Sequence, residues 1–242
     1  MSTELRQIDV GGLAVEVHRK SIRNLHVGVY PPEGRVRVAA PAHMDEEAIR
    51  LAVVSRLAWI RRQQRMFQAQ PRESGREMVT GESHYFRGQR YRLNVTEQRG
   101  ATGVRLVRNH TMELTAPPGS DLEARQRLLQ RWYREQLRQR IHELLPGWQS
   151  VVGEEVAECR IKQMKTKWGS CNIEARRIWL NLDLIRKPEP CLEYILVHEL
   201  VHLLERQHND RFRTLMDRFL PDWRLRRDQL NQSPLAHQGW DY

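Results

Sequence analysis

The segment from His198 to His208, HELVHLLERQH, constrains this chain more than any other stretch. Successive residues of an α-helix turn by about 100°, so on a helix His198 and His202 project from one face, one turn apart, with Glu199 beside them. Two neutral imidazoles suit a borderline-soft divalent metal such as Zn²⁺, which in catalytic sites keeps three protein ligands and a water. Glu199 is then placed to take a proton from that water, as in the HExxH pattern of zinc hydrolases.

The residues around this motif favour a metal site over an amphipathic helix with two incidental surface histidines. The apolar neighbours are Ile195, Leu196, Val197, Leu200, Val201, Leu203 and Leu204. A helix that is apolar nearly all round is buried. Buried histidines and a buried glutamate need polar partners, and a metal ion supplies one.

We predict His208 as the third ligand. On an unbroken helix it would lie roughly 240° around from His202 and about 9 Å further along, too far away to share a metal. We therefore predict a helix break between Leu204 and Asn209, where Asn209 is a good cap residue. Metzincins place a glycine three residues after the second histidine, whereas this chain has Glu205 there. Glu205 is also the strongest local rival as a ligand, because it would lie next to His202 on a continuing helix.

The composition limits the kinds of binding partner and the cellular compartment that we expect. The formal net charge is +10 and the pI about 10.1, which favours an anionic partner or, alternatively, serves only solubility. The sequence has no apolar signal region and no apolar run of about 18 residues, so we expect a cytoplasmic protein without a membrane partner. Three cysteines, Cys159, Cys171 and Cys191, indicate reduced thiols. Cys171 stays open as a ligand that would make the zinc structural.

The N-terminal part predicts strands and helices in a repeated order. Residues 5–40 alternate as short strands, and Asp45 to Gln68 is predicted to be a helix with the apolar stripe Ile49, Val53, Leu57 and Ile60. The sequence VAAP at 38–41 corresponds to LTAP at 114–117, and an acidic helix start follows each. We interpret residues 5–70 and 81–147 as a duplicated strand–strand–helix unit. The alternative is two unrelated hairpin–helix units with similar turns.

The second helix is predicted from about Asp121 to Leu145, ending at Pro146. Its predicted inner face is Leu128, Leu129, Trp132, Leu137, Ile141 and Leu144. Its predicted outer face is Arg125, Arg127, Arg131, Arg134, Arg138 and Arg140. Because arginine suits phosphate groups, this face is a candidate for polyanion or nucleic-acid contact. A solvated helix face explains the same pattern.

Four ordered motifs resemble the YgjP-like metallopeptidase family: KTKWGSCN, RIWLNLDL, a proline-led helix with HELVH, and HNDRF. The resemblance is closest from Lys165 to Phe219, and the chain is also similar to the SprT-like group. It implies a zincin-type active site. The resemblance implies that His198, His202 and His208 are the metal ligands and that Glu199 is the catalytic residue.

We therefore expect an α+β fold, with antiparallel strand–helix units followed by a zincin-like metallopeptidase core that contains the HExxH helix. The predicted domains are an N-terminal strand and helix region at 1–150, a catalytic core at 151–223 and a polar, loose tail at 224–242. The segment Trp168 to Cys171 is predicted either to line the metal cleft or to form a tight turn with Trp168 buried.

The leading functional hypothesis is zinc-dependent hydrolysis of an amide bond in a peptide or protein, with a zinc-bound water as nucleophile and Glu199 as general base. The strand from Ile178 to Asn181 is expected to be a sheet edge that holds an extended peptide. One alternative is a metal-dependent hydrolase of nucleotides or phosphoanhydrides, with basic residues on the phosphates. Another is a nucleic-acid-associated protein whose structural zinc is closed by four protein ligands.

Overall fold

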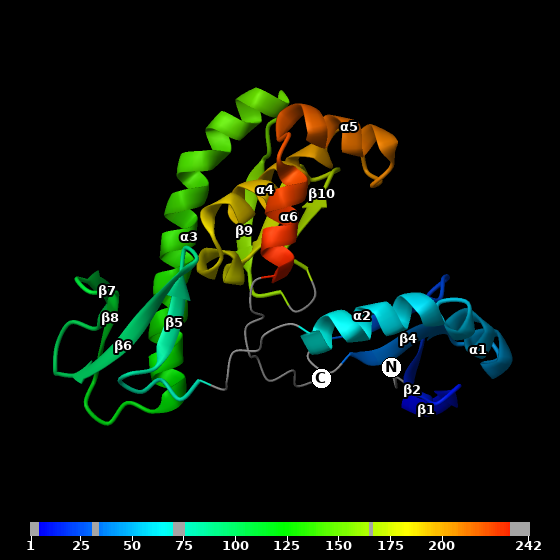
Figure 1. Ribbon diagram of the computed structural model, residues 1–242, viewed down its shortest axis with the longest axis horizontal. Helices are drawn as coiled ribbons and strands as arrows, with labels where there is room; N and C mark the ends of the chain where they lie inside the picture. The colour runs from blue at the N-terminus through cyan, green and yellow to red at the C-terminus, as the bar shows by residue number, and fades with distance from the viewer. Residues whose placement is uncertain (1–4, 31–33, 70–75, 165–166, 233–242) are drawn as a thin grey trace. The chain divides into compact units, whose positions relative to one another are not determined.

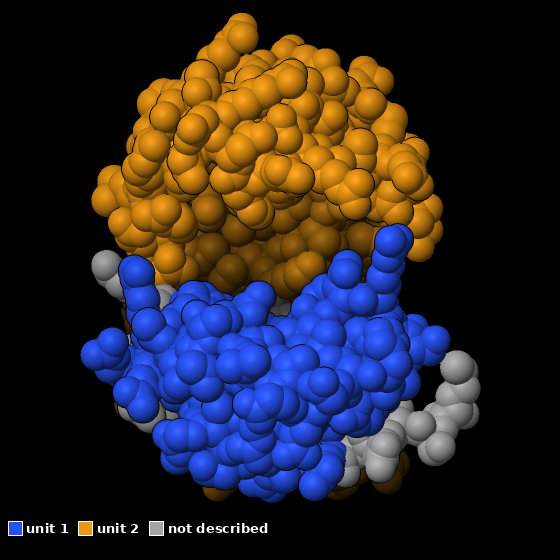
Figure 2. Space-filling view, turned by 90° about the vertical axis from the view of Figure 1, so that its right-hand side faces the viewer, with its two compact units in different colours: residues 1–71 blue, residues 72–242 orange. Residues whose placement is uncertain are grey.

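The computed structural model describes most of the chain and shows a mixed α+β protein, as the sequence predicts (Figure 1). The described residues are 5–30, 34–69, 76–164 and 167–232. They form six α-helices and three β-sheets. None of these helices is long and apolar enough to cross a bilayer. The chain divides into two compact units, residues 1–71 and 72–242, which Figure 2 colours separately.

The first unit is a four-stranded sheet with two helices. Its strands are β1 (Leu5–Val10), β2 (Leu13–Lys20), β3 (His26–Tyr30) and β4 (Arg35–Pro41), in the spatial order β1-β2-β4-β3. β2 and β4 run parallel, and the outer pairs run antiparallel. The predicted antiparallel arrangement is therefore wrong for the central pair, because β3 lies at the edge and β4 takes the position beside β2. Val15 and Val36, partners across that pair, are both buried.

Two helices replace the single helix predicted from Asp45 to Gln68. They are α1 (Glu46–Val54) and α2 (Leu57–Ala69). At the junction the Arg56 N–H donates to the Val53 carbonyl, 3.0 Å away. This three-residue bond tightens the last turn and separates the two helices. The stripe residues Ile49, Val53 and Ile60 are buried as predicted.

The second unit begins with a sheet of the same topology. Its strands are β5 (Ser83–Phe86), β6 (Gln89–Glu97), β7 (Gly103–Val107) and β8 (Thr111–Ala116), in the order β5-β6-β8-β7. Its central pair, β6 and β8, is also parallel, so the antiparallel prediction fails here for the same reason. Asp45 and Asp121 cap the helices that follow the two sheets, each accepting a hydrogen bond from a backbone N–H, of Ala48 and Ala124 respectively. The repeated plan thus extends to topology and capping, and common descent of the two units stays a prediction.

α3 (Leu122–Val152) is the long helix that follows this sheet (Figure 1). It passes through Pro146, where the sequence predicts its end, and stops at Gly153 with a positive φ of 79°. An interior proline removes one helix hydrogen bond, but Val152 beyond it is buried in the core, which favours the longer helix. The buried face consists of Leu128, Leu129, Tyr133, Leu137 and Ile141. Tyr133 thus takes the place predicted for Trp132.

The third sheet consists of β9 (Glu158–Lys162), β10 (Gly169–Asn172) and β11 (Arg177–Asn181), in the order β10-β11-β9. β11 pairs antiparallel with β10 and parallel with β9. The predicted edge at Ile178 to Asn181 is therefore wrong: β11 is the central strand, and β10 is an edge.

The chain ends in a short 3₁₀ helix and three α-helices. These are η1 (Leu182–Arg186), α4 (Glu189–Val201), α5 (Asp210–Phe219) and α6 (Trp223–Gln232). α6 packs against α4, with Leu230 buried and Arg226 bonded to Glu193 at 2.5 Å. The loose tail predicted from residue 224 is thus a helix as far as Gln232, and residues 233–242 lie outside the described part.

The β5–β6 hairpin is tied to the segment before α4. The Arg87 N–H donates to the Ile185 carbonyl at 2.8 Å. Gly88 has a positive φ of 77°, and a Cβ there would lie 2.9 Å from Pro188. The hairpin, α3 and α4 share one hydrophobic core. The boundary predicted at residue 150 therefore lies inside a continuous helix and a shared core, and the independent folding of 1–150 and 151–223 stays a prediction.

Candidate metal centre

α4 carries the first two histidines of the motif on its last turn. Pro188 precedes the helix, with a further proline inside its first turn, where the missing N–H costs nothing. The helix is buried nearly all round, as its apolar sequence predicts. His198 and Glu199 lie within it, and His202 is its C-terminal cap residue.

The chain turns after His202 and returns toward it. The Glu205 N–H donates to the Val201 carbonyl at 2.9 Å, the last bond of helical type. Asn209 then caps α5 through its side chain, which accepts from the Phe212 N–H at 3.0 Å. The break therefore begins near His202, slightly earlier than the predicted interval, and the Asn209 cap is confirmed.

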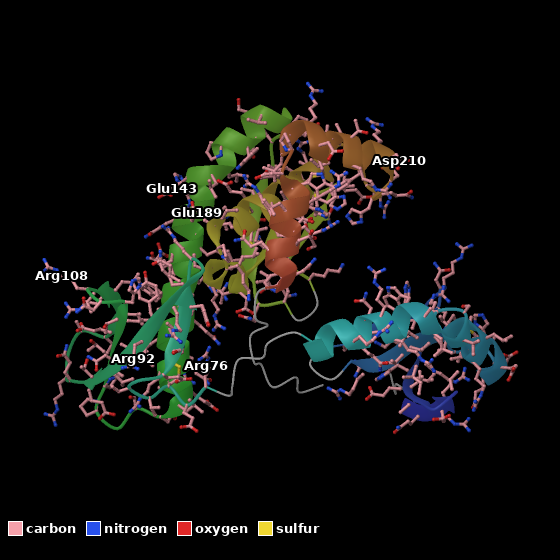
Figure 3. All side chains as sticks on the ribbon, in the orientation of Figure 1. Arg76, Arg92, Arg108, Glu143, Glu189 and Asp210 are labelled. Atoms are coloured by element: carbon pink, nitrogen blue, oxygen red, sulfur yellow. The ribbon has the colours of Figure 1, made fainter. Side chains whose placement is uncertain are left out.

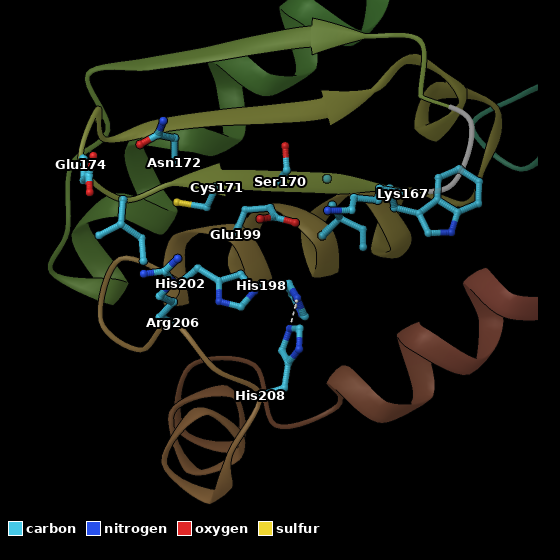
Figure 4. Close-up of a pocket in the computed structure, with 14 residues that line it drawn as sticks. Lys167, Ser170, Cys171, Asn172, Glu174, His198, Glu199, His202, Arg206 and His208 are labelled. Carbon is cyan, nitrogen blue, oxygen red and sulfur yellow. Dashed lines mark hydrogen bonds between the residues drawn. The ribbon is translucent and has the colours of Figure 1, made fainter. Parts of the chain in front are cut away.

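This turn brings the three predicted histidines together (Figure 4). One ring nitrogen from each of His198, His202 and His208 lies within 4.8 Å of the other two. The Nε2 atoms of His198 and His208 are 3.0 Å apart. Two nitrogens bound to one tetrahedral zinc at 2.0–2.1 Å would be about 3.3 Å apart, and the separation of this pair is close to that value. Within the described residues this is the group of histidine, cysteine and acidic side chains close enough to share a metal, and it contains neither Glu205 nor Cys171.

Phe212 contacts all three imidazole rings. Its side chain is buried, and its ring centroid lies 4.9 Å from that of His198 and 4.8 Å from those of His202 and His208. Edge-on and tilted ring contacts at this distance are favourable. The sequence alone does not predict these contacts, because they depend on the turn that follows His202.

Glu205 shapes the site through its backbone and its side chain. The His202 Nδ1 atom lies 3.1 Å from the Glu205 carbonyl, so a neutral ring donates there and leaves Nε2 free as a ligand. The Glu205 carboxylate accepts from the Gln207 N–H at 3.1 Å, and this bond is the main cause of its lowered pKa. The residue predicted as a rival ligand lies outside the converging group. Its carbonyl contacts the His202 ring, and its carboxylate braces the turn. The order of side chains in the sequence could not predict this contact, because the Glu205 backbone carbonyl makes it.

Burial keeps two of the histidines in the form that binds metals. Desolvation, and secondarily the nearby His202 and His208, lowers the pKa of His198 to about 3. Desolvation is also the largest cause of the lowered pKa of His202. Both rings are therefore neutral near pH 7 and need lose no proton to bind a cation.

Glu199 is buried beside the histidines without being one of the group. It is 5% exposed, and burial raises its pKa to about 8, against a smaller lowering by Lys167. Its Oε2 atom has no hydrogen-bond partner among the described residues. A Cβ on Gly169 would lie 2.5 Å from Glu199 Oε1, so the backbone of β10 lies directly against the carboxylate. A buried polar atom without a partner is costly, so Glu199 Oε2 is a candidate contact for a bound ligand.

The histidines and Glu199 open into a cleft of about 730 Å³ between α4 and β10 (Figure 4). Trp168, Gly169, Ser170 and Cys171 line it, with Lys167 and Arg206 among the charged lining residues. The cleft-lining interpretation of this segment therefore holds, and Trp168 is half-buried, with Lys187 Nζ 5.6 Å from its ring centre. Lys165 and Thr166, which begin the KTKWGSCN motif, lie outside the described residues.

The chain matches the model of the YgjP-like family, described as a metallopeptidase domain, over residues 24–233. No curated protein matches it. Among solved structures it is similar to the crystal structure of the metallopeptidase zymogen of Pyrococcus abyssi abylysin, at 22% identity and a TM-score of 0.35, over 37% of this chain and 90% of that one. The family match spans most of the 242 residues and takes in both α4 and His208. The chain therefore belongs to the YgjP-like metallopeptidase family.

Proposed function

We propose that this chain is a zinc-dependent peptidase in which His198, His202 and His208 hold the metal and Glu199 handles the proton. The observation that carries the proposal is the convergence of three imidazole nitrogens within 4.8 Å beside a buried carboxylate. Three imidazoles form a donor set that zinc prefers, and three protein ligands leave a coordination position for chemistry. The family's metallopeptidase domain supports a peptide or protein substrate.

The residues divide the chemical work. Bound zinc would supply Lewis acidity, which polarises a substrate carbonyl and lowers the pKa of a water. Glu199 accepts the proton that the attacking water loses and returns it to the leaving amine. Burial raises the pKa of Glu199 to about 8 in the metal-free chain. A bound cation would favour the charged form and lower that pKa, which would leave a carboxylate able to accept a proton near neutral pH.

The edge strand β10 supports binding of an extended peptide. β10 pairs with β11 on one side only, and its residues line the cleft that contains Glu199. An extended peptide can add to such an edge through main-chain hydrogen bonds, which hold the scissile bond without reading its side chains. This role moves from β11, where the sequence analysis places it, to β10.

We expect purified protein to contain about one zinc per chain. His198→Ala/His202→Ala should retain less than about a tenth of that content, because two of three ligands are removed. Inductively coupled plasma mass spectrometry measures the metal, and circular dichroism checks the fold. His142→Ala, on an exposed residue of α3, is the control and should keep its zinc. Stoichiometric zinc in a folded double variant would refute the site.

Gly169→Ala should reduce peptide cleavage by at least about 10-fold while leaving zinc content near wild type. The added Cβ would lie 2.5 Å from Glu199 Oε1 and 2.8 Å from its Cγ, so the carboxylate must move, and small displacements of a catalytic group cost rate. Cleavage of a mixed fluorogenic peptide library measures the effect. Gly103→Ala is the matched control, since Gly103 begins a strand and a Cβ there meets nothing within 4 Å. Equal activity in the two variants would contradict the proposed place of Glu199.

A further inference from the structure

A second, smaller hollow lies where α3 meets β9. Its volume is about 250 Å³. We call it the arginine pocket, and the residues that define it are Arg134, Arg138, Arg160, Trp179, Cys159 and Ile161. None of the residues that line it also lines the metal cleft.

Two of the three guanidinium groups in this pocket have contacts that hold them against the sheet. Arg134 donates to the Ile161 carbonyl at 2.8 Å, which fixes it against the edge of β9. The Arg160 guanidinium lies 5.3 Å from the centre of the Trp179 ring, a distance at which a cation is attracted to an aromatic face. Arg160 also pairs with Glu158, and Arg138 pairs with Glu135. Neither carboxylate lines the pocket, so its lining carries three positive charges and no negative one.

Such an arrangement is suited to a compact anion. Three arginines line this hollow, two of them paired with carboxylates that lie outside it. An oxyanion in the hollow would add an attractive interaction with each arginine. Each guanidinium has five N–H donors in a planar fork that matches phosphate oxygens, and the one hydrogen bond of Arg134 to Ile161 uses one of its five. The volume of about 250 Å³ is below the roughly 300–1,000 Å³ of pockets for drug-sized ligands.

We propose that the arginine pocket binds a compact, multiply charged oxyanion of the phosphate class, independently of the metal centre. The proposal goes beyond peptide hydrolysis, since it assigns a second ligand to a different place on the molecule. The sequence analysis predicts a polyanion-binding face of six arginines on α3. The proposal keeps two of them, Arg134 and Arg138, and adds Arg160 from β9.

The other arginines of the predicted outer face are engaged elsewhere or lie outside the pocket. Arg125 bonds to Glu97, and Arg140 pairs with Glu143 and Glu189, two carboxylates labelled near α3 in Figure 3. Arg131 is exposed and does not line the pocket. It therefore offers a control with the same charge on the same helix.

Titration calorimetry with inorganic pyrophosphate tests the proposal. We expect saturable binding of one ion per chain, at least about 10-fold weaker in Arg138→Gln/Arg160→Gln and within about 2-fold of wild type in Arg131→Gln. Glutamine keeps part of the side-chain stem and removes the charge, so packing changes least. The affinity should be unaltered in His198→Ala/His202→Ala, which separates this site from the metal centre. Zinc content and peptide cleavage, measured on the same samples, report on the proposed peptidase separately.

Three results would overturn the assignment. They are the absence of saturable binding, equal weakening by Arg131→Gln, which would indicate a general field of positive charge, and loss of binding in the histidine variant alone, which would place the ion in the metal cleft. If the double variant does not fold, Arg138→Gln carries the test, because that residue is exposed on a helix surface.

Discussion

Glu199→Gln is expected to bind zinc with nearly wild-type affinity and to lose peptide cleavage by at least about 10³-fold. The substitution keeps the shape of the side chain and removes the base, and general base catalysis contributes typically 10²–10⁴-fold. Glu199 lies beside the three histidines but outside the group whose nitrogens converge. Steady-state cleavage and zinc content, measured on the same preparation, test both halves of the prediction.

Glu174→Gln is the matched control, because Glu174 is an exposed carboxylate on the same cleft and should retain most activity. A folded Glu199→Gln protein that lost its zinc would make Glu199 a ligand. One that kept its activity would remove it from the mechanism.

The raised pKa of Glu199 gives this variant a second readout in the metal-free chain. Burial raises that pKa from 4.5 to about 8, so the folded state favours the protonated carboxyl. Its contribution to stability is therefore complete below about pH 4.5 and is lost as the pH rises through about 8. Unfolding in urea should show that the metal-free wild type loses stability relative to Glu199→Gln between pH 5 and 9. Parallel curves would contradict the burial of an ionisable group there.

Local chemistry in the sequence predicts the elements around the site well. The apolar surroundings of HELVH predict a buried α4, and the preference of asparagine for helix caps predicts the start of α5 at Asn209. Both depend on residues within one or two turns of each other. The triad follows from them, because His208 returns to the first two histidines once the chain breaks between the two helices.

Features that depend on long-range pairing are not predicted. The sequence analysis predicts β11 as an edge strand, but it pairs with both β9 and β10. Which strands pair depends on contacts across the whole sheet, and a local pattern does not contain them. The same holds for the parallel pair β2 and β4, which sequence-adjacent hairpins do not reveal. α3 continues past Pro146 because Val152 beyond it is buried in the core, although proline locally favours the end of a helix. The arginine pocket joins α3 to β9, so no single segment shows it.

The fourth protein ligand that a structural zinc requires has no candidate in the described part of the chain. The group of converging donors contains three histidines. Cys171 lines the cleft, but its sulfur is not one of the donor atoms that converge. The donor set therefore favours the open, catalytic arrangement.

His208→Ala should weaken zinc binding by about 10³-fold or more, whereas Glu205→Ala should weaken it by about 10-fold. His208 supplies one of three donors, and its Nε2 lies 3.0 Å from that of His198. Glu205→Ala removes only a carboxylate that braces the turn, so its effect should lie at the low end of the 10–100-fold that groups outside the ligand set typically contribute to affinity. Competition with a chromogenic zinc chelator measures both variants against wild type.

The small effect of Glu205→Ala follows from which atoms the substitution removes. Alanine keeps the backbone carbonyl that orients the His202 Nδ1–H and loses only the carboxylate that accepts from the Gln207 N–H. Glu205→Gln should recover most of that loss, because its side-chain oxygen can accept the same hydrogen bond. If Glu205→Ala instead weakened zinc as much as His208→Ala, and glutamine did not restore it, the carboxylate itself would be a ligand. The turn would then serve Glu205 rather than His208, and the site would be a two-histidine, one-carboxylate centre.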